Sequence, residues 1–330
     1  MNALSALFRA EPTPNARRFD GQRGHVESYF LRLNHPSQQR AVWLKQTILA
    51  PLSGEAIAES WVIFFDGQKV VAEKATVPWA QARYDDPQIE TPSMKLAVGA
   101  EGSARGEIAP VRFDFTWRSA ESSRPLELFP YRLLRVGPFP RSKLNTPAPS
   151  IIASGAVHVA GEHVDITGWT GSQGHNWGRE HSFEYAWGQA VFPEQDAFLE
   201  GFTGRVRFAG RTTPRMSALI VRHAGRELRF DRIFDPWRQE QHVETDRWEI
   251  RLRSNDGEAH LVMDSRDRGQ ACLGYLNPDG AMSYCFNSKL ASVALEVRPS
   301  DGASFTLKSE HGGALEFLRR EPDPRFTRVV

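Results

Sequence analysis

One stretch of the sequence, residues 167–192, concentrates the residue types that could do chemistry. It holds three tryptophans, two histidines and two glutamates, and glycines recur through it. Glycine lets the backbone turn tightly or approach another group closely. Tryptophan supplies a large apolar face with one N–H donor, and histidine and glutamate supply protons. This mixture suits the lining of a pocket, and it suits equally well a buried barrel corner in which His175 is only hydrogen-bonded.

Proton-assisted addition to an alkene is one chemistry that these residues could support. Adding water or a phenol to an isolated double bond needs a strong proton donor and walls that tolerate a carbocation. A carboxylic acid in apolar surroundings keeps its proton near neutral pH, because desolvation disfavours the carboxylate. Aromatic faces stabilise a cation by about 0.5–2 kcal/mol each. Glu200 lies in an apolar run and is a candidate acid, whereas an arginine partner, Arg205 or Arg207, would give it a structural role.

The other candidate side chains also have structural alternatives. Tyr185 could donate a proton or bond a substrate oxygen, but a buried tyrosine hydroxyl commonly finds a backbone partner. We expect Glu180 at a solvated rim, and the sequence leaves Glu184 undecided between rim and pocket. The tryptophans could line the pocket or belong to the core, where we expect at least one of them. The candidate ligand-binding residues are Trp169, Trp177, Trp187, Gln173 and Asn176.

The sequence predicts neither a metal site nor a cofactor site. His175 and His181 are six residues apart, and His158 and His163 precede them, but no zinc or facial-triad spacing links these histidines. A Gly-rich phosphate loop after a strand and a Gly-x-Ser-x-Gly nucleophile elbow are both missing. Any chemistry is therefore expected to rest on the side chains alone.

Charge and hydropathy exclude two further classes of partner. The formal net charge of the 330-residue chain is +1, and its basic residues do not gather into the stripe expected of a nucleic-acid-binding surface. No continuously apolar segment reaches the roughly 18–20 residues of a membrane span. Arg9 and Glu11 interrupt what would be the apolar part of a signal peptide. We therefore expect a soluble, cytoplasmic protein that binds neither nucleic acid nor a membrane.

The elements that must position these residues are predicted to be almost all β-strands. Alternating apolar and polar residues recur between turn signals, several of them Asp-Gly, and this pattern is typical of sandwiches and barrels. A short helix at 1–10 is the one helical candidate, and four prolines make 138–149 the best linker candidate. We place the change of domain at residue 175, so that the domains are 1–174 and 175–330. The expected strands include 26–33, 42–49, 59–65, 113–117, 157–159, 164–166, 248–252 and 293–297.

The two cysteines flank a strong hairpin signal. Asn277-Pro278-Asp279-Gly280 favours a type I turn with glycine in the left-handed position, which gives a G1 bulge. That register pairs Cys272 with Phe286 and Leu273 with Cys285. The two thiols then lie on opposite faces of the hairpin, and we expect both to be free.

Several motifs resemble one known superfamily. They are 27–32 (ESYFLR), 41–48 (AVWLKQTI), 171–178 (GSQGHNWG) and 185–189 (YAWGQ), and the resemblance runs from about residue 24 to residue 288. The chain is similar to the tocopherol cyclase and carotenoid hydratase (hydroxyneurosporene synthase) superfamily, and most closely to its uncharacterised bacterial branch. The resemblance implies two tandem lipocalin-like antiparallel β-barrels packed against each other. It implies an activity chosen among hydration of an isoprenoid, cyclisation of a prenylated quinol and steering of a cycloaddition.

The resemblance also implies roles for particular residues. In carotenoid hydratases the His-Asn-Trp-Gly element is functional, which corresponds to His175 and Trp177. Those enzymes also use a Tyr-x-Asp pair on a later strand, where this sequence has Phe198-Leu199-Glu200. The tyrosine is therefore missing, and glutamate replaces aspartate.

Three hypotheses follow for the function. The first is a cofactor-independent enzyme that hydrates, cyclises or isomerises a hydrophobic substrate between the barrels, with His175, Glu200 and Tyr185 as catalytic candidates. The second is a non-catalytic carrier of a small lipophilic ligand, since lipocalin-like barrels hold one readily. The third is a filled pair of barrels that associates with another protein. An open cavity that reaches His175 and Glu200 favours catalysis, an open cavity without them favours carriage, and a filled interior favours association.

Overall fold

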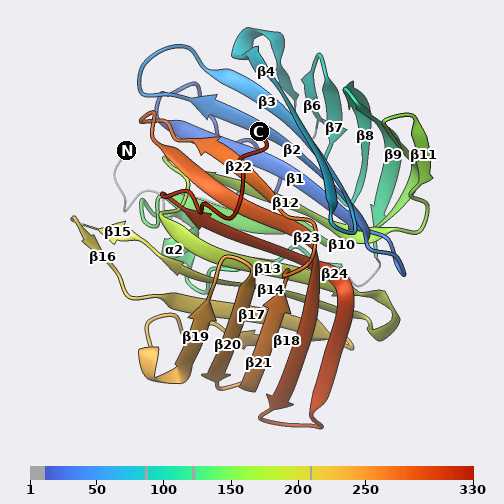
Figure 1. Ribbon diagram of the computed structural model, residues 1–330. Coiled ribbons are helices and arrows are strands. Elements are labelled where there is room, and N and C mark those ends of the chain that lie inside the picture. Colours follow the sequence, from blue (N-terminus) through green and yellow to red (C-terminus); the bar gives the residue numbers. More distant parts are fainter. Residues whose placement is uncertain (1–11, 86–87, 121–122, 209) are drawn as a thin grey trace.

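The protein folds into two strongly curled antiparallel sheets that pack against each other (Figure 1). The computed structural model describes residues 12–85, 88–120, 123–208 and 210–330. Two large sheets, with few and short helices, hold nearly all of the regular structure of these residues. The prediction of an all-β fold with two lipocalin-like barrels is therefore confirmed.

The first sheet is built from the N-terminal half of the chain. Its strand order is β4 (Lys69–Pro78), β3 (Ile57–Asp66), β2 (Arg40–Ala50), β1 (His25–Asn34), β12 (Thr170–Gly178), β10 (Ser142–Val159), β9 (Val111–Ser119), β8 (Glu101–Ile108), β7 (Met94–Ala97), β6 (Gln88–Thr91) and β5 (Arg83–Asp85), and β11 (Glu162–Asp165) pairs with β10. A 3₁₀ turn, η1 (Trp79–Gln81), follows β4. The short helix α2 (Arg132–Val136) lies in the segment that connects β9 to β10.

The second sheet is built from the C-terminal half. Its order is β18 (Arg226–Phe230), β17 (Met216–His223), β14 (Ala197–Arg205), β13 (Glu184–Phe192), β24 (Phe305–Arg319), β23 (Met282–Pro299), β21 (Gly257–Asp264), β20 (Arg247–Ser254) and β19 (Gln239–Val243), and β22 (Ala271–Leu276) pairs with β23. A small hairpin, β15 (Arg207–Phe208) and β16 (Arg211–Thr212), projects beyond β14. Two 3₁₀ turns, η2 (Pro193–Gln195) and η3 (Pro236–Arg238), join strands.

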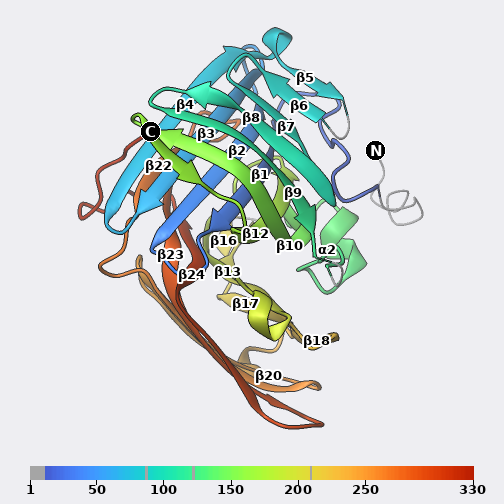
Figure 2. The same ribbon diagram turned by 90° about the vertical axis from the view of Figure 1, so that its right-hand side faces the viewer.

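The two halves share one topology. In each half the first strand pairs with the last, β1 with β12 and β13 with β24. In each half a bent strand of 18 residues, β10 or β23, lies beside that last strand, and register shifts mark its bends. Figure 2 shows the long β23 and β24 running from beside the first sheet down into the second. The halves therefore share a fold although their sequences show no evident repeat.

The strands at the junction are buried on both faces. Successive side chains of a strand point to opposite faces of its sheet. In β1 and β2, Leu31 and Leu44 pack inside the first barrel, whereas Phe30 and Trp43 pack against the second barrel. The same outer cluster includes Trp187 of β13. Hydrophobic cores therefore fill both barrels, and a third apolar cluster joins them.

The expected strands are present, but two features of the predicted organisation need comment. The proline-rich segment 138–149 is not a linker, because β10 begins at Ser142 and runs through it. Pro147 and Pro149 lie where β10 changes register against β12, and proline, which lacks an N–H donor, is tolerated at such bulges. The predicted domain change at residue 175 falls within β12, and the second sheet begins at Glu184. The division into domains 1–174 and 175–330 stays a prediction.

The cysteine hairpin has the predicted register. The Asn277 N–H donates to the carbonyl of Ala281, and Gly280 has a positive φ of 85°. Cys272 pairs with Phe286, and Leu273 pairs with Cys285. Both cysteines are free and buried. Cys272 packs inside the second barrel, and Cys285 packs in the cluster between the barrels.

These two thiols should react rapidly with a thiol reagent only after the protein has unfolded. Burial raises the pKa of both thiols, most strongly for Cys285, and the thiolate is the reactive form. We expect Ellman's reagent to count two thiols in the denatured, unreduced protein and to react slowly with the native protein. A denatured protein without free thiols would contradict the register.

Two predictions concern helices. The short helix expected at 1–10 lies outside the described residues. Within the described part of the chain, none of the helices is long and apolar enough to cross a membrane.

Candidate functional site

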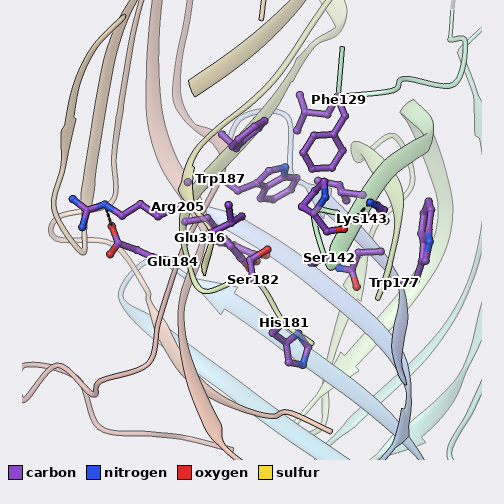
Figure 3. Close-up of a pocket in the computed structure, with 18 of the residues that line it drawn as sticks. Phe129, Ser142, Lys143, Trp177, His181, Ser182, Glu184, Trp187, Arg205 and Glu316 are labelled. Atoms are coloured by element: carbon purple, nitrogen blue, oxygen red, sulfur yellow. Dashed lines mark hydrogen bonds and ion pairs between the residues drawn. The ribbon is translucent and has the colours of Figure 1, made fainter. Parts of the chain in front are cut away.

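A cavity of about 150 Å³ opens at the junction of the two barrels. β1, β2, β10 and β12 supply its wall on one side, and β13, β14, β17, β22 and β24 supply the other. The connection between β9 and β10 covers it with apolar side chains, among them Phe129 and Leu134. Figure 3 shows Trp187 and Glu316 near the centre of this site, and Trp177 on the opposite side from Glu184 and Arg205.

The alternation of β13 explains how its residues reach the cavity. Ala186 and Ala190 point into the core of the second barrel, so Tyr185 and Trp187 point toward the junction and line the cavity. Gly188 lies on the same inner face as Ala186 and Ala190. It leaves room inside the barrel, because a Cβ there would clash with the sulfur of Met263. The glycine and aromatic residues of this segment thus serve packing and lining together.

A buried carboxylate lies beside Tyr185. The Tyr185 hydroxyl donates to Oε2 of Glu316 over 3.4 Å, and both residues line the cavity. On the other side, Lys289 Nζ and Asn287 Nδ2 donate to Oε1 of Glu316 over 2.6 and 3.0 Å. Burial, and then the nearby Cys285 and Glu316, raise the pKa of Tyr185 well above its usual value. The site therefore offers the cavity an ion-paired carboxylate and a protonated phenol.

Lys45 of β2 reaches the same cavity from the first barrel. It is 3% exposed, and its Nζ lies 3.7 Å from the centre of the Tyr275 ring. No hydrogen bond joins its ammonium group to any residue that the structure describes. Burial lowers its pKa to about 8. His181, which also lines the cavity, has a pKa lowered to about 3 by burial and is therefore neutral.

His175 does not line the cavity. It lies inside the mouth of the first barrel, stacked on Tyr29 at 4.2 Å. Its Nε2 donates to Oε1 of Glu27 over 2.9 Å, and its Nδ1 donates to the carbonyl of Pro14 over 2.8 Å. Both partners of the ring are acceptors, and the ring lies fixed between them. The geometry matches the structural alternative, a hydrogen-bonded histidine at a barrel corner.

The partner of His175 is the centre of a larger network. Glu27 is fully buried and accepts hydrogen bonds from the backbone N–H groups of Arg18 and Phe19. It also accepts from the side chains of His25 and Tyr29. Although desolvation opposes ionisation, the hydrogen bonds from the two histidines lower the pKa of Glu27. This network fastens the segment before β1 to the barrel wall.

Glu200 lies behind the cavity wall. It is fully buried on β14, and it accepts hydrogen bonds from Trp187 Nε1 at 3.0 Å and from the Thr146 hydroxyl at 2.7 Å. Burial raises its pKa. The arginines considered as partners lie elsewhere, since Arg205 pairs with Glu184 and Arg207 lies over the Phe183 ring. Glu200 therefore orients Trp187 and joins the two barrels.

The other predicted residues divide into two groups. Trp187, Trp177 and Asn176 line the cavity, whereas Trp169 and Gln173 are buried away from it, Trp169 in the core of the first barrel. The rim position expected for Glu180 agrees with its ion pairs to Arg141 and Arg320. Glu184 lines the cavity and pairs with Arg215 and Arg205.

Sequence reasoning missed Lys45, Glu316 and Lys289. Glu316 is a charged residue within an apolar run of a strand, the same signal that singled out Glu200, whereas Gln46 follows Lys45 and Ser288 precedes Lys289, so the two lysines give a weaker signal. A buried charge needs a partner or a function, because burial of an isolated charge is costly. Lys45 on β2 is far in sequence from Lys289 on β23 and Glu316 on β24, so only the fold brings it to them.

The arrangement offers no evident metal site. His158 and His163 lie 3.4 Å apart, nitrogen to nitrogen, on an exposed hairpin. Among the described residues, no group of three or more histidine, cysteine or acidic side chains could hold a metal ion.

Comparisons with known proteins agree on the fold. No family model matches the chain. An uncharacterized protein of Mycobacterium tuberculosis, matched in two strains, is 22% identical over 282 residues, which are 85% of this chain and 83% of that protein. A solved structure from Nitrosomonas europaea, provisionally named ATTH, has a TM-score of 0.63 at 14% identity and covers 94% of this chain and 97% of its own.

A second solved structure is that of an enzyme. Kievitone hydratase from Nectria haematococca has a TM-score of 0.53 at 11% identity, and the match covers 90% of this chain and 89% of that one. At such identities the likeness establishes a common fold. The two-barrel fold that the superfamily resemblance implies is thus shared with a hydratase.

Proposed function

We propose that this protein is a cofactor-independent enzyme that acts on a hydrophobic, isoprenoid- or polyketide-like substrate in the cavity between the barrels. Acid-assisted hydration, cyclisation or isomerisation is the proposed reaction class. The cytoplasmic location expected from the sequence belongs to the same proposal. The observation that carries it is the pairing of Tyr185 with Glu316 at the wall of a largely apolar cavity.

The chemistry of this pair favours proton transfer at an activated carbon. A phenol with a raised pKa is too weak an acid to protonate an isolated alkene, but it can donate a hydrogen bond or a proton to a substrate oxygen. The Glu316 carboxylate, which pairs with Lys289, can accept a proton directly or through the Tyr185 hydroxyl. General acid–base catalysis of this kind contributes about 10²–10⁴-fold to a rate. Isomerisation or cyclisation next to a carbonyl or phenol is therefore favoured within the class.

The apolar wall supports a substrate of lipophilic character. Trp187, Phe129 and Leu134 face the cavity from three different segments, and pockets lined in this way bury most of a small hydrophobic ligand. Kievitone hydratase, by its name, hydrates the small molecule kievitone. Its likeness to this chain lends support to a hydratase-like use of the shared fold.

The second candidate function is carriage of a lipophilic ligand without turnover. One observation favours it, since the cavity reaches neither His175 nor Glu200, the acids that the sequence put forward. Under this alternative Tyr185 and Glu316 bind the ligand without transforming it.

Organic extraction of the natively purified protein, followed by mass spectrometry, tests the proposal. We expect a lipophilic compound at up to one equivalent, and a change of its mass or isomeric form on incubation with fresh protein. If one equivalent of a compound is extracted and fresh protein leaves it unchanged, the carrier function is favoured. Failure to bind or convert any compound from a lipid extract of the host would contradict both functions.

Two tryptophan variants make the extraction specific for the cavity. Val206→Trp adds bulk at a half-buried residue of the lining and should abolish retention of the compound. Leu52→Trp adds the same bulk at a 60%-exposed residue that does not line the cavity, and it should retain the compound fully. Trp177→Ala is a poorer choice, because Trp177 packs on His175 and its loss would also disturb the first barrel.

A further inference from the structure

The charges at the inner end of the cavity do not balance. We define the inner end by Lys45, Tyr275, Tyr185 and Glu316, which meet there from β2, β22, β13 and β24. Lys289 neutralises Glu316 across 2.6 Å. The ammonium group of Lys45 lies over the Tyr275 ring, and among the described residues it has neither a hydrogen bond nor a carboxylate within 4 Å.

The other titratable groups around Lys45 do not supply the missing charge. Glu59 pairs with Lys74 at 3.5 Å. The Cys285 thiol is protonated because burial raises its pKa, and His181 is neutral because burial lowers its pKa. Lys289 adds positive charge, which Glu316 already offsets. One positive charge therefore faces the cavity without a counter-ion from the protein.

We propose that the inner end of the cavity binds an anionic oxygen of the ligand, a carboxylate or phenolate at one end of an apolar molecule, through the ammonium group of Lys45. This inference rests on the proposed use of the cavity as the ligand site, and it names the class of ligand. Burying an unpaired charge is costly, and an oxyanion in reach of three N–H donors offsets that cost. The Tyr275 ring 3.7 Å away holds the ammonium in place by a cation–π contact.

The direction of the ligand follows from the lining. The oxyanion lies beside Lys45, so the apolar body extends between Trp187 and the aromatic side chains of the covering segment, such as Phe129. In this orientation the carbon next to the oxygen function comes close to Tyr185 and Glu316. A neutral ligand of the same shape would leave the Lys45 charge unpaired and should bind less tightly.

A pair of fluorescent probes tests the charge preference. The anionic probe is 8-anilino-1-naphthalenesulfonate, and the neutral probe is N-phenyl-1-naphthylamine, which has the same rings without the sulfonate. Hydrogen bonds to charged groups are strong enough that Lys45→Met should weaken binding of the anionic probe about 10- to 100-fold. The neutral probe should bind the variant as well as, or better than, the original protein.

Lys95→Met is the matched control. Lys95 carries the same side chain at an exposed position of β7 and does not line the cavity. Its replacement should leave the affinity for both probes within about twofold, which is less than the effect of a charged hydrogen bond. The proposal is overturned if Lys45→Met loses affinity for both probes equally, or loses none for the anionic probe. It is also overturned if the original protein does not bind the anionic probe.

The pH dependence gives a second measurement that needs no variant. The ammonium groups of Lys45 and of Lys143, the other lysine of the cavity lining, lose their protons as the pH rises through about 8, whereas the sulfonate stays ionised. Affinity for the anionic probe should therefore fall above pH 8, and affinity for the neutral probe should not. A flat profile for the anionic probe would overturn the proposal even if Lys45→Met failed to fold. If the original protein binds the probes as expected but turns over no substrate, the proposed reaction alone fails.

Discussion

Glu316→Gln and Tyr185→Phe should each reduce turnover of the extracted substrate by about 10²–10⁴-fold, the usual contribution of a general acid or base. The amide introduced by Glu316→Gln would keep a hydrogen bond from Asn287 but could not accept a proton. The phenyl ring introduced by Tyr185→Phe would keep the aromatic wall and lose only the hydroxyl that bonds Glu316. The measurement is kcat under substrate saturation, with the fold of each variant checked by its circular dichroism spectrum.

Tyr84→Phe provides the control for loss of a tyrosine hydroxyl. The Tyr84 hydroxyl is buried in the first barrel, has no hydrogen-bond partner among the described residues and does not line the cavity. Its removal should leave kcat within about twofold, which is far below the effect of a lost acid or base. If Tyr185→Phe and Glu316→Gln were as active as Tyr84→Phe, the pair would have no catalytic role and the carrier function would be favoured.

Glu27→Ala should destabilise the fold by about 3–5 kcal/mol, the usual cost of removing one partner from a buried ion pair. The substitution would leave the His175 ring, the Tyr29 hydroxyl and two backbone N–H groups without their acceptor. The free energy of unfolding, measured in urea, checks the expectation. Glu162→Ala, which removes an exposed partner of Arg40, should cost less than about 1 kcal/mol.

The same carboxylate makes the fold sensitive to acid. The pKa of Glu27 is lowered in the folded state, so its contribution is fully present above the unfolded pKa of about 4.3 and is lost as the pH falls through the folded value. Stability should therefore drop below about pH 4 in the original protein and drop less steeply in Glu27→Ala. The network is contradicted if the free energy of unfolding falls equally steeply with acid in both proteins. It is also contradicted if Glu27→Ala lowers that free energy no more than Glu162→Ala does.

Alternation and turn chemistry were enough to predict the strands and the cysteine hairpin. Both are local, since an Asp-Gly turn or the Asn277–Gly280 turn sets the register of its own hairpin. The prolines at 147 and 149 misled the prediction because a strand can tolerate proline where its register shifts. The sequence motif also placed Tyr185, Trp177, Trp187 and Asn176 at the cavity, because β13 and the end of β12 form part of its wall.

The functional groups were harder to predict because their partners are distant in sequence. His175 and Glu200 are of residue types that can act as acids or bases. The structure instead ties His175 to Glu27 and Pro14 by hydrogen bonds. It ties Glu200 to Trp187 and Thr146 in the same way. The charge of Lys45 and the carboxylate of Glu316 meet only when the two barrels pack. Residue type shows that a group could do chemistry, and tertiary packing decides whether a cavity reaches it.

A crystal structure of the protein soaked with 8-anilino-1-naphthalenesulfonate tests most directly whether the cavity between the barrels is the ligand site. We predict electron density for the rings of the probe between Trp187 and Phe129, with a sulfonate oxygen about 3 Å from Lys45 Nζ, the length of a hydrogen bond. Density inside either barrel or on the outer surface, with the cavity between the barrels unoccupied, would contradict the proposed site.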